Sequence, residues 1–190
     1  MMKRTMLGLA AAAFVALPSI SHAQRRASAS TPIRFSMGAG VAMPMSDLGD
    51  GVGTGFHVEG LGERKLASAP VFLRGELGFT MFGKKDLQGT GVKGSANSIA
   101  GMFDVGYNFV TSTSVKPYLV GGLGMHHSSY TVDATNLRNG TKQTDSKNDL
   151  GVNVGGGMRF KMGSRQASLE ARYIAAGDMK QLPIGLSIQF

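Results

Sequence analysis

The amino-acid sequence predicts an all-β fold, an eight-stranded antiparallel up-and-down β-barrel, and three observations support this prediction. Large apolar side chains occupy every second position in eight separate stretches, which is the period of a strand with one apolar face. The connections between these stretches alternate between longer and shorter. The stretch 181–190 is long enough to cross a bilayer as a tilted strand. We therefore expect a transmembrane barrel.

Residues 1–23 are expected to be a secretory signal peptide. The basic start Met1–Arg4 precedes an apolar run over residues 6–17, and Ser21–Ala23 provides a small-residue cleavage site. The apolar run is too short to span a bilayer as a helix. We expect residues 24–32 to form a short periplasmic tail and residues 33–190 to form the barrel.

The first four expected strands each alternate between an apolar face and a small or polar face. Their ranges are 33–43, 55–62, 70–82 and 97–109. Their apolar faces carry Phe35, Met37 and Val41, then Phe56 and Val58, then Leu73, Leu77 and Phe79, then Ile99, Phe103 and Val105. Because strand side chains alternate in direction, the residues between these point to the opposite face.

The last four expected strands follow the same rule. Their ranges are 116–125, 149–160, 166–174 and 181–190. Their apolar faces carry Leu119, Leu123 and Met125, then Leu150, Val152 and Val154, then Leu169 and Tyr173, then Leu182, Ile184, Leu186, Ile188 and Phe190.

The connections predict which end of the barrel faces which side of the membrane. Four longer, polar or Gly-rich connections lie at one end, over residues 44–54, 83–96, 126–148 and 175–180. Three short turns lie at the other, over residues 63–69, 110–115 and 161–165. Barrels of this kind have short periplasmic turns and longer extracellular loops.

Aromatic residues near the strand ends predict two interfacial rings, as the edges of a bilayer favour. Phe35, Tyr107, Phe109, Tyr118, Phe160 and Phe190 would form the ring at the short-turn end. Phe56, Phe79, Phe82 and Tyr173 would form the ring at the other end.

The charged residues within the strands all fall opposite the apolar face, so we expect them inside the barrel. They are Arg34, Glu59, Arg74, Glu76, Asp104, Arg159, Glu170 and Arg172. Four are basic and four are acidic. We expect them to pair with charges on neighbouring strands, because unpaired buried charge is costly. An eight-stranded barrel is narrow enough for side chains to fill its interior.

Residues His126, His127, Ser128 and Ser129 are the one candidate for catalysis. This run resembles the His/Ser pairing of outer-membrane lipid A deacylases, in which His is the base and Ser the nucleophile. Those enzymes also use a Glu, and no Glu occurs between Ser129 and Glu170. We therefore expect no catalysis, and we expect no cofactor and no bound metal.

The whole pattern resembles the small OmpA/OmpX-type bacterial outer-membrane barrel family. The resemblance implies localisation in the bacterial outer membrane and a structural or surface-interaction role. It also implies contact with outer-membrane lipid and lipopolysaccharide, and a monomeric barrel. The sequence does not identify a partner at the cell surface. Phe190 would be the signal that the outer-membrane assembly machinery recognises.

Two other function classes stay open from the sequence, besides the outer-membrane barrel without catalysis. One is a lipid A deacylase-like enzyme using the His-Ser pair. The other is a secreted, soluble, lipocalin-like barrel that binds a small apolar ligand, with its apolar face inside. The formal net charge of +8 does not indicate nucleic-acid binding, because no basic stripe with interleaved aromatic residues is present.

Overall fold

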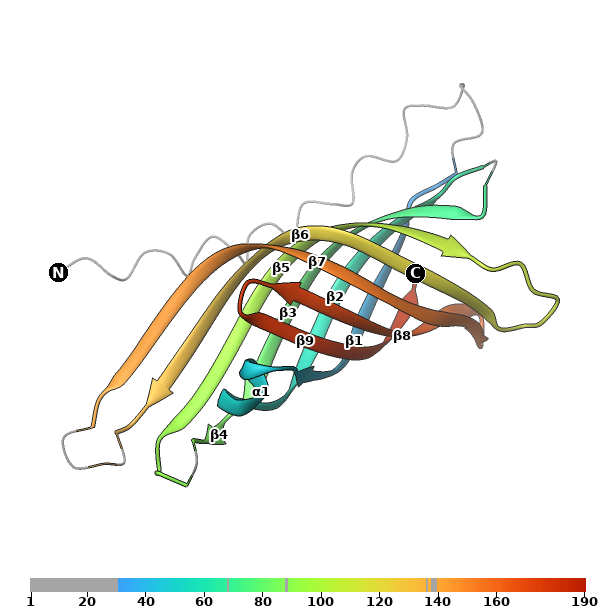
Figure 1. Cartoon of the computed structure of the whole chain (residues 1–190). Coiled ribbons are helices and arrows are strands. Elements are labelled where there is room, and N and C mark those ends of the chain that lie inside the picture. The colour runs from blue at the N-terminus through green and yellow to red at the C-terminus, as the bar shows by residue number, and fades with distance from the viewer. Residues whose placement is uncertain (1–30, 68, 88, 136, 138–139) are drawn as a thin grey trace. The chain divides into compact units, whose positions relative to one another are not determined.

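The computed structural model describes residues 31–190, apart from residues 68, 88, 136 and 138–139 (Figure 1). The expected signal peptide and most of the expected tail lie outside the described residues. The strands are β1 (Arg34–Pro44), β2 (Gly53–Lys65), β3 (Val71–Gly83), β4 (Lys85–Asp86), β5 (Lys93–Asn108), β6 (Lys116–Asp133), β7 (Lys142–Met162), β8 (Arg165–Ala176) and β9 (Met179–Gln189). A single helical turn, α1 (Asp47–Gly51), lies between β1 and β2.

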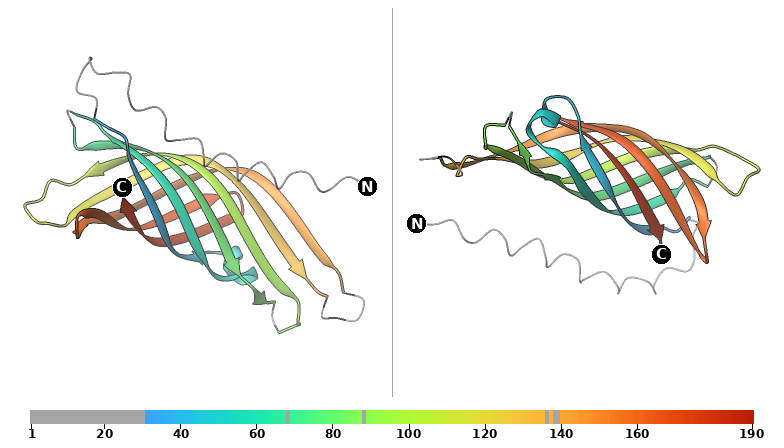
Figure 2. Two further views of the ribbon diagram at one scale, coloured as in Figure 1. Left: turned by 180° about the vertical axis from the view of Figure 1, so that it is seen from behind. Right: turned by 90° about the horizontal axis from the view of Figure 1, so that it is seen from below.

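Eight of these strands close into an antiparallel barrel, which confirms the predicted fold class. Consecutive strands pair with each other, except that β3 pairs with β5 and not with the short strand β4. The first and last barrel strands complete the ring, with Ala39 of β1 opposite Leu186 of β9. The two-residue strand β4 adds to the outer end of β5. Figure 2 shows the closed ring from two further sides.

The apolar faces of the strands point outward. Leu77 and Val154 expose 60% and 63% of their surface, whereas Arg74 and Glu76 on the opposite face of β3 are buried. An outer surface of this kind suits hydrocarbon, because lipid solvates the apolar side chains. Among the described residues, no helix is both long and apolar enough to cross a membrane. The lipocalin-like alternative is wrong, because it required the apolar face inside.

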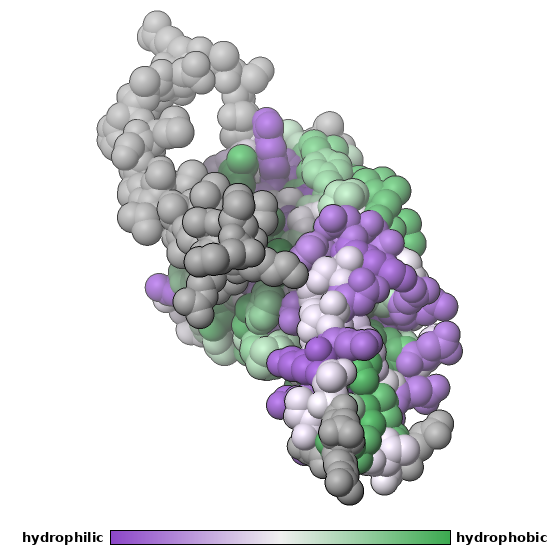
Figure 3. Space-filling model, turned by 90° about the vertical axis from the view of Figure 1, so that its left-hand side faces the viewer, coloured by the Kyte–Doolittle hydropathy of each residue, from purple (hydrophilic) through white to green (hydrophobic). Residues whose placement is uncertain are grey.

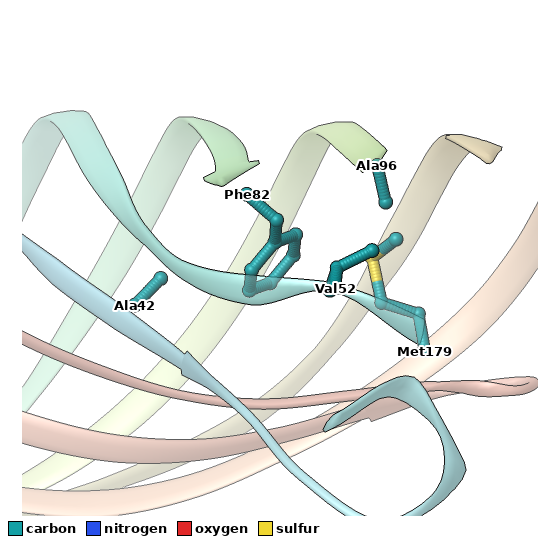
Figure 4. Close-up of a cluster of buried hydrophobic side chains, with 5 residues drawn as sticks. All are labelled: Ala42, Val52, Phe82, Ala96 and Met179. Atoms are coloured by element: carbon teal, nitrogen blue, oxygen red, sulfur yellow. The ribbon is translucent and has the colours of Figure 1, made fainter. Parts of the chain in front are cut away.

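Two aromatic residues differ from the expected rings. Tyr118 and Phe82 are buried inside the barrel, since their neighbours Leu119 and Met81 point outward and strand parity turns them inward. Phe82 joins an apolar cluster at the outer end of the lumen. That cluster consists of Ala42, Val52, Phe82, Ala96 and Met179 (Figure 4). Leu48 and Tyr130 pack against it.

The expected loop over residues 126–148 is mostly strand. Strand β6 continues to Asp133 and β7 begins at Lys142, and the two stay paired over this whole length. Hydroxyl pairs join them, with 2.7 Å between the Ser129 and Ser146 Oγ atoms. Most residues on both faces are polar here, because this part lies beyond the apolar belt, so hydrophobic alternation does not mark it. The tip predicted at Asn139 lies outside the described residues.

Strands β5, β6 and β7 therefore project past the outer end of their neighbours (Figure 1). Strand β7 pairs with β8 only from Gly151 onward. Within the described residues, the edge of β7 over residues 142–150 has no second strand beside it. Hydrophilic side chains gather on the end of the barrel that Figure 3 turns toward the viewer.

One outer connection is shorter than expected. The sequence predicts a connection over residues 175–180, but β8 and β9 are joined by Gly177 and Asp178 alone. Gly177 has a φ of 55°, a left-handed conformation that glycine adopts without a steric penalty. Two-residue hairpin turns need such a residue, and the sequence pattern did not reveal it.

We predict that lipid-facing and inward substitutions on β9 differ in cost. Leu186→Arg should destabilise the folded barrel by about 2–4 kcal/mol, because it places a charge in the hydrocarbon. Ser187→Ala, on the inward side, should be nearly neutral. Equilibrium unfolding in lipid vesicles measures both, and equal sensitivity would contradict the facing assigned here.

Candidate functional site

The barrel interior holds the largest cluster of charged side chains in the described part of the chain. It contains Glu59 and Glu63 of β2, Arg74 and Glu76 of β3, Asp104 of β5, Arg159 of β7, and Glu170 and Arg172 of β8. Glu63 was missed because we expected it in the turn 63–69. Strand β2 continues to Lys65, and the parity of Glu63 matches that of Glu59, so a longer strand assignment would have found it.

Arg172 is the centre of this network. Its Nη2 atom lies 3.1 Å from Glu59 Oε2 and 2.6 Å from Glu76 Oε2. Its Nη1 atom lies 3.2 Å from Asp104 Oδ2, and its Nε atom lies 3.0 Å from Glu170 Oε1. One guanidinium group therefore contacts carboxylates from four strands, and it is itself buried.

A second group of contacts lies nearer the short-turn end. Arg74 Nη1 donates to both oxygens of Glu170, at 3.1 and 2.8 Å, and Arg74 Nη2 lies 3.5 Å from Glu63. Arg159 Nη2 lies 2.6 Å from the same Glu63 oxygen. The hydroxyl of Tyr118 also donates to Glu170. Since Glu170 contacts both Arg74 and Arg172, the two groups form one network.

Aromatic rings support the two arginines at this end. The guanidinium of Arg159 lies 4.5 Å from the ring centre of Phe72 and 4.3 Å from that of Tyr118. Arg74 lies 5.3 and 5.6 Å from the same two rings. Such cation–π contacts strengthen when the groups are removed from water.

Most of the ion pairs run across the lumen. Arg74 and Glu63 pair between the neighbouring strands β2 and β3 as expected, but for the other pairs the expectation of neighbouring strands is wrong. Arg74 of β3 contacts Glu170 of β8, and Arg172 of β8 contacts Glu59 of β2. A narrow barrel allows long side chains from opposite strands to meet in its centre. Arg34 is only half-buried at the start of β1, and no ion pair joins it to another described residue.

The His/Ser run does not form a catalytic pair. Strand parity turns His126 and Ser128 inward, and His127 and Ser129 outward. The Ser128 hydroxyl contacts Met179 and Ser98, whereas Ser129 bonds to Ser146. His127 Nδ1 bonds to Asn148 at 2.8 Å.

The imidazole of His126 is not paired with a serine either. Both ring nitrogens of His126 are buried without a hydrogen-bond partner among the described residues. Glu170 lies within the arginine network, so it does not orient a histidine of this run.

An open pocket of about 280 Å³ lies at the outer end, between α1, the base of the β6–β7 hairpin and the β8–β9 turn. Ser128, Tyr130, Asp145, Asp149 and Met179 are among the residues that line it. Lys147 and Asp178, also in the lining, form an exposed ion pair with 3.0 Å between Nζ and Oδ2. Their hydrogen bond lowers the pKa of Asp178 and raises the pKa of Lys147. The pair therefore persists at neutral pH and weakens as the pH falls through the Asp178 pKa.

A family model described as "Outer membrane protein beta-barrel domain" matches residues 7–190. No curated protein matches the chain.

Solved structures of outer-membrane proteins have the same fold. Neisserial surface protein A is 19% identical, with a TM-score of 0.55, over 83% of this chain and 95% of that one. A major outer membrane protein from Thermus thermophilus is 15% identical, with a TM-score of 0.60, over 84% of this chain and 100% of that one. The attachment invasion locus protein Ail of Yersinia pestis, in complex with the heparin analogue sucrose octasulfate, is 16% identical, with a TM-score of 0.54, over 83% and 99%. At these identities the likeness establishes the fold alone.

We predict that Arg172 is the most sensitive interior charge. Arg172→Ala should cost about 3–5 kcal/mol, because four carboxylates lose their shared cation. Water entering the space would lower this figure. Combining Glu170→Ala with Arg172→Ala should cost less than the sum of the two single changes, because the residues are in contact.

Chemical unfolding in lipid vesicles provides the measurement for this double-mutant cycle. Lys161→Ala is the control, since Lys161 is exposed, and it should change stability by less than about 0.5 kcal/mol. Strict additivity of the two interior changes would contradict a coupled network.

Proposed function

The chain belongs to the outer membrane protein β-barrel domain family and lies in the bacterial outer membrane, and from this premise we propose that it is a non-catalytic barrel with a structural or surface-interaction role. The observation that carries the proposal is the division of the molecule into three parts. These are an apolar outer belt, a lumen crossed by ion pairs, and a polar sheet that projects from one end.

The buried lumen side chains support a filled interior without a wide pore. The apolar cluster around Phe82 lies at the outer end, and a second apolar cluster of Ala100, Met102 and Ile174 is also buried. The arginine network crosses the lumen, and Phe72 and Tyr118 pack against the part of it that lies nearer the short-turn end. Eight strands enclose a space that side chains of this size fill.

The absence of catalysis is supported by the geometry of the His/Ser run. A nucleophilic serine needs a base within hydrogen-bond reach. Neither Ser128 nor Ser129 has a histidine among its hydrogen-bond partners in the described residues. The deacylase-like alternative therefore has no assembled site to support it.

The projecting sheet supports a role at the cell surface. On the side away from β6, residues 142–150 of β7 have no neighbouring strand among the described residues. This edge carries charges of both signs, including Lys142, Asp145 and Lys147. Charged edge strands resist pairing with further copies of the same chain. A polar, mixed-charge surface of this kind suits contact with lipopolysaccharide headgroups or a surface partner, and it is compatible with a monomer.

The opposite end is suited to the inner leaflet. Lys65, Lys116 and Arg159 line a pocket of about 280 Å³ there, beside the apolar residues Leu66 and Phe109. Basic side chains near a membrane surface attract anionic lipid. We therefore place this end in contact with periplasmic-leaflet phospholipid.

Single-cysteine labelling tests the proposed orientation of the barrel. No other thiol reacts, because the natural chain contains no cysteine. Lys142→Cys, on the exposed projecting sheet, should react with a membrane-impermeant maleimide on intact cells. Ser164→Cys, in the exposed β7–β8 turn, should react only after the outer membrane is permeabilised. The reverse pattern would overturn the proposed orientation.

We also predict that the purified wild-type barrel gives only small or irregular conductance in planar lipid bilayers. The physical reason is the set of buried ion pairs across the lumen. A gel comparing unboiled with boiled samples verifies that the protein is folded, because a folded barrel migrates faster. Stable, large single-channel steps from folded protein would make it a porin and refute the filled interior.

A further inference from the structure

Three inward side chains in the outer half of the barrel converge on one point. One donor atom from each of His57, Glu59 and Glu76 lies within 4.8 Å of the other two. The closest pair, His57 Nε2 and Glu59 Oε2, is 3.4 Å apart. Two ligands of a tetrahedral zinc ion, bound at their usual lengths, also lie about 3.4 Å apart. A small closure of the Glu76 side chain would complete a three-ligand set.

The imidazole of His57 is already oriented for this purpose. Its Nδ1 atom lies 2.8 Å from the hydroxyl of Thr80 on the neighbouring strand, and both residues are buried. This contact turns Nε2 toward the two carboxylates. Metal-binding histidines commonly have their second ring nitrogen fixed by such a hydrogen bond.

The side chains of His57, Glu59 and Glu76 occupy space that is open because Gly38 and Gly78 have no Cβ atom. A Cβ atom at Gly78 would lie 3.1 Å from His57 Cε1 and 3.5 Å from Glu76 Oε1. A Cβ atom at Gly38 would lie 2.7 Å from Glu59 Oε1. The approach of all three groups therefore depends on these two positions lacking a side chain.

The charge balance of the interior also favours an additional cation. The network joins five carboxylates, those of Glu59, Glu63, Glu76, Asp104 and Glu170, to the guanidinium groups of Arg74, Arg159 and Arg172. Within this network five negative groups share three positive ones, and the further cations Arg34 and Lys65 lie near Glu63 at the short-turn end. Buried carboxylate charge is costly unless it is neutralised.

Glu76 shows this excess most clearly. Its side chain has no exposure to solvent, and its Oε1 atom has no hydrogen-bond partner among the described residues. The nearby Arg172 Nη2 lies 2.6 Å from Oε2, which leaves Oε1 free and directed toward Gly78 and His57. Buried polar atoms without a partner are uncommon and point to a bound water or ion.

Arg172 does not exclude a cation from this point. It also contacts Asp104 and Glu170, so it keeps two carboxylates if a metal takes Glu59 and Glu76. A cavity of about 10 Å³ borders His57, Glu59 and Arg172. A space of about this volume holds one water molecule, the usual fourth ligand of an open zinc site.

We propose that His57, Glu59 and Glu76 bind one divalent transition-metal ion of the zinc type inside the barrel. One imidazole nitrogen and two carboxylate oxygens form a ligand set suited to such an ion. The ion neutralises the carboxylates that the three arginines do not balance. Because the apolar cluster around Phe82 lies between this point and the outer end, the metal enters as the barrel folds.

The test measures Zn²⁺ retained by the folded barrel. The protein is refolded into detergent micelles with Zn²⁺, desalted, and analysed for metal content, and its affinity is then measured by competition with a chelator. We expect one equivalent per chain. His57→Ala and Glu76→Gln should abolish retention, and Thr80→Val should weaken the affinity by about 10–100-fold because it frees the His57 ring.

His127→Ala is the matched control, since His127 is exposed on the outer face of β6 and bonds only to Asn148 among the described residues. It should retain the full equivalent. The gel mobility of unboiled samples shows which variants fold, and Glu76→Gln keeps the side-chain volume if His57→Ala does not fold. No retention by the wild type, or loss in His127→Ala with retention in His57→Ala, would overturn the proposal.

Discussion

The structure depends on neutralising charge in a narrow space that eight strands enclose. Arg172 contacts carboxylates on β2, β3, β5 and its own strand, so its side chain holds distant parts of the ring together. A shift of β8 by one residue would turn Arg172 and Glu170 toward lipid and apolar side chains toward the charges. The same contacts that satisfy buried charge therefore also specify how the strands align.

Along its length the sheet passes from the hydrocarbon of the membrane into water. Within the apolar belt, side chains such as Leu123 and Val152 face outward while His126 and Asn153 face inward. Beyond the belt, β6 and β7 keep their backbone pairing but carry polar residues on both faces. Hydrogen bonding between strands is independent of the solvent, whereas side-chain alternation is a response to it.

The fold is shared with barrels that are less than a fifth identical in sequence. A closed ring with an apolar exterior requires only a pattern of alternation, which many sequences satisfy. The fold alone does not determine which side chains point inward or how far the sheet extends at the outer end. The proposed metal site is formed by inward side chains, and the proposed surface contact is made by the extended sheet.

The sequence by itself determined the eight strands, their antiparallel order and the face to which most side chains point, because alternation is local and survives in any such barrel. It failed where that signal stops. The polar hairpin after His126 looked like a loop, the Gly177–Asp178 turn looked longer, and Glu63 looked like a turn residue.

Only the tertiary structure decided which charges meet. Arg74 contacts Glu170 and Arg172 contacts Glu59 across the lumen, and His57 comes near Glu76, because the tilt and stagger of the strands bring them to one height. The signal peptide and the assembly role of Phe190 stay predictions. Pairing across a closed ring depends on its radius and stagger, and these are properties of all the strands together, which no single stretch of sequence contains.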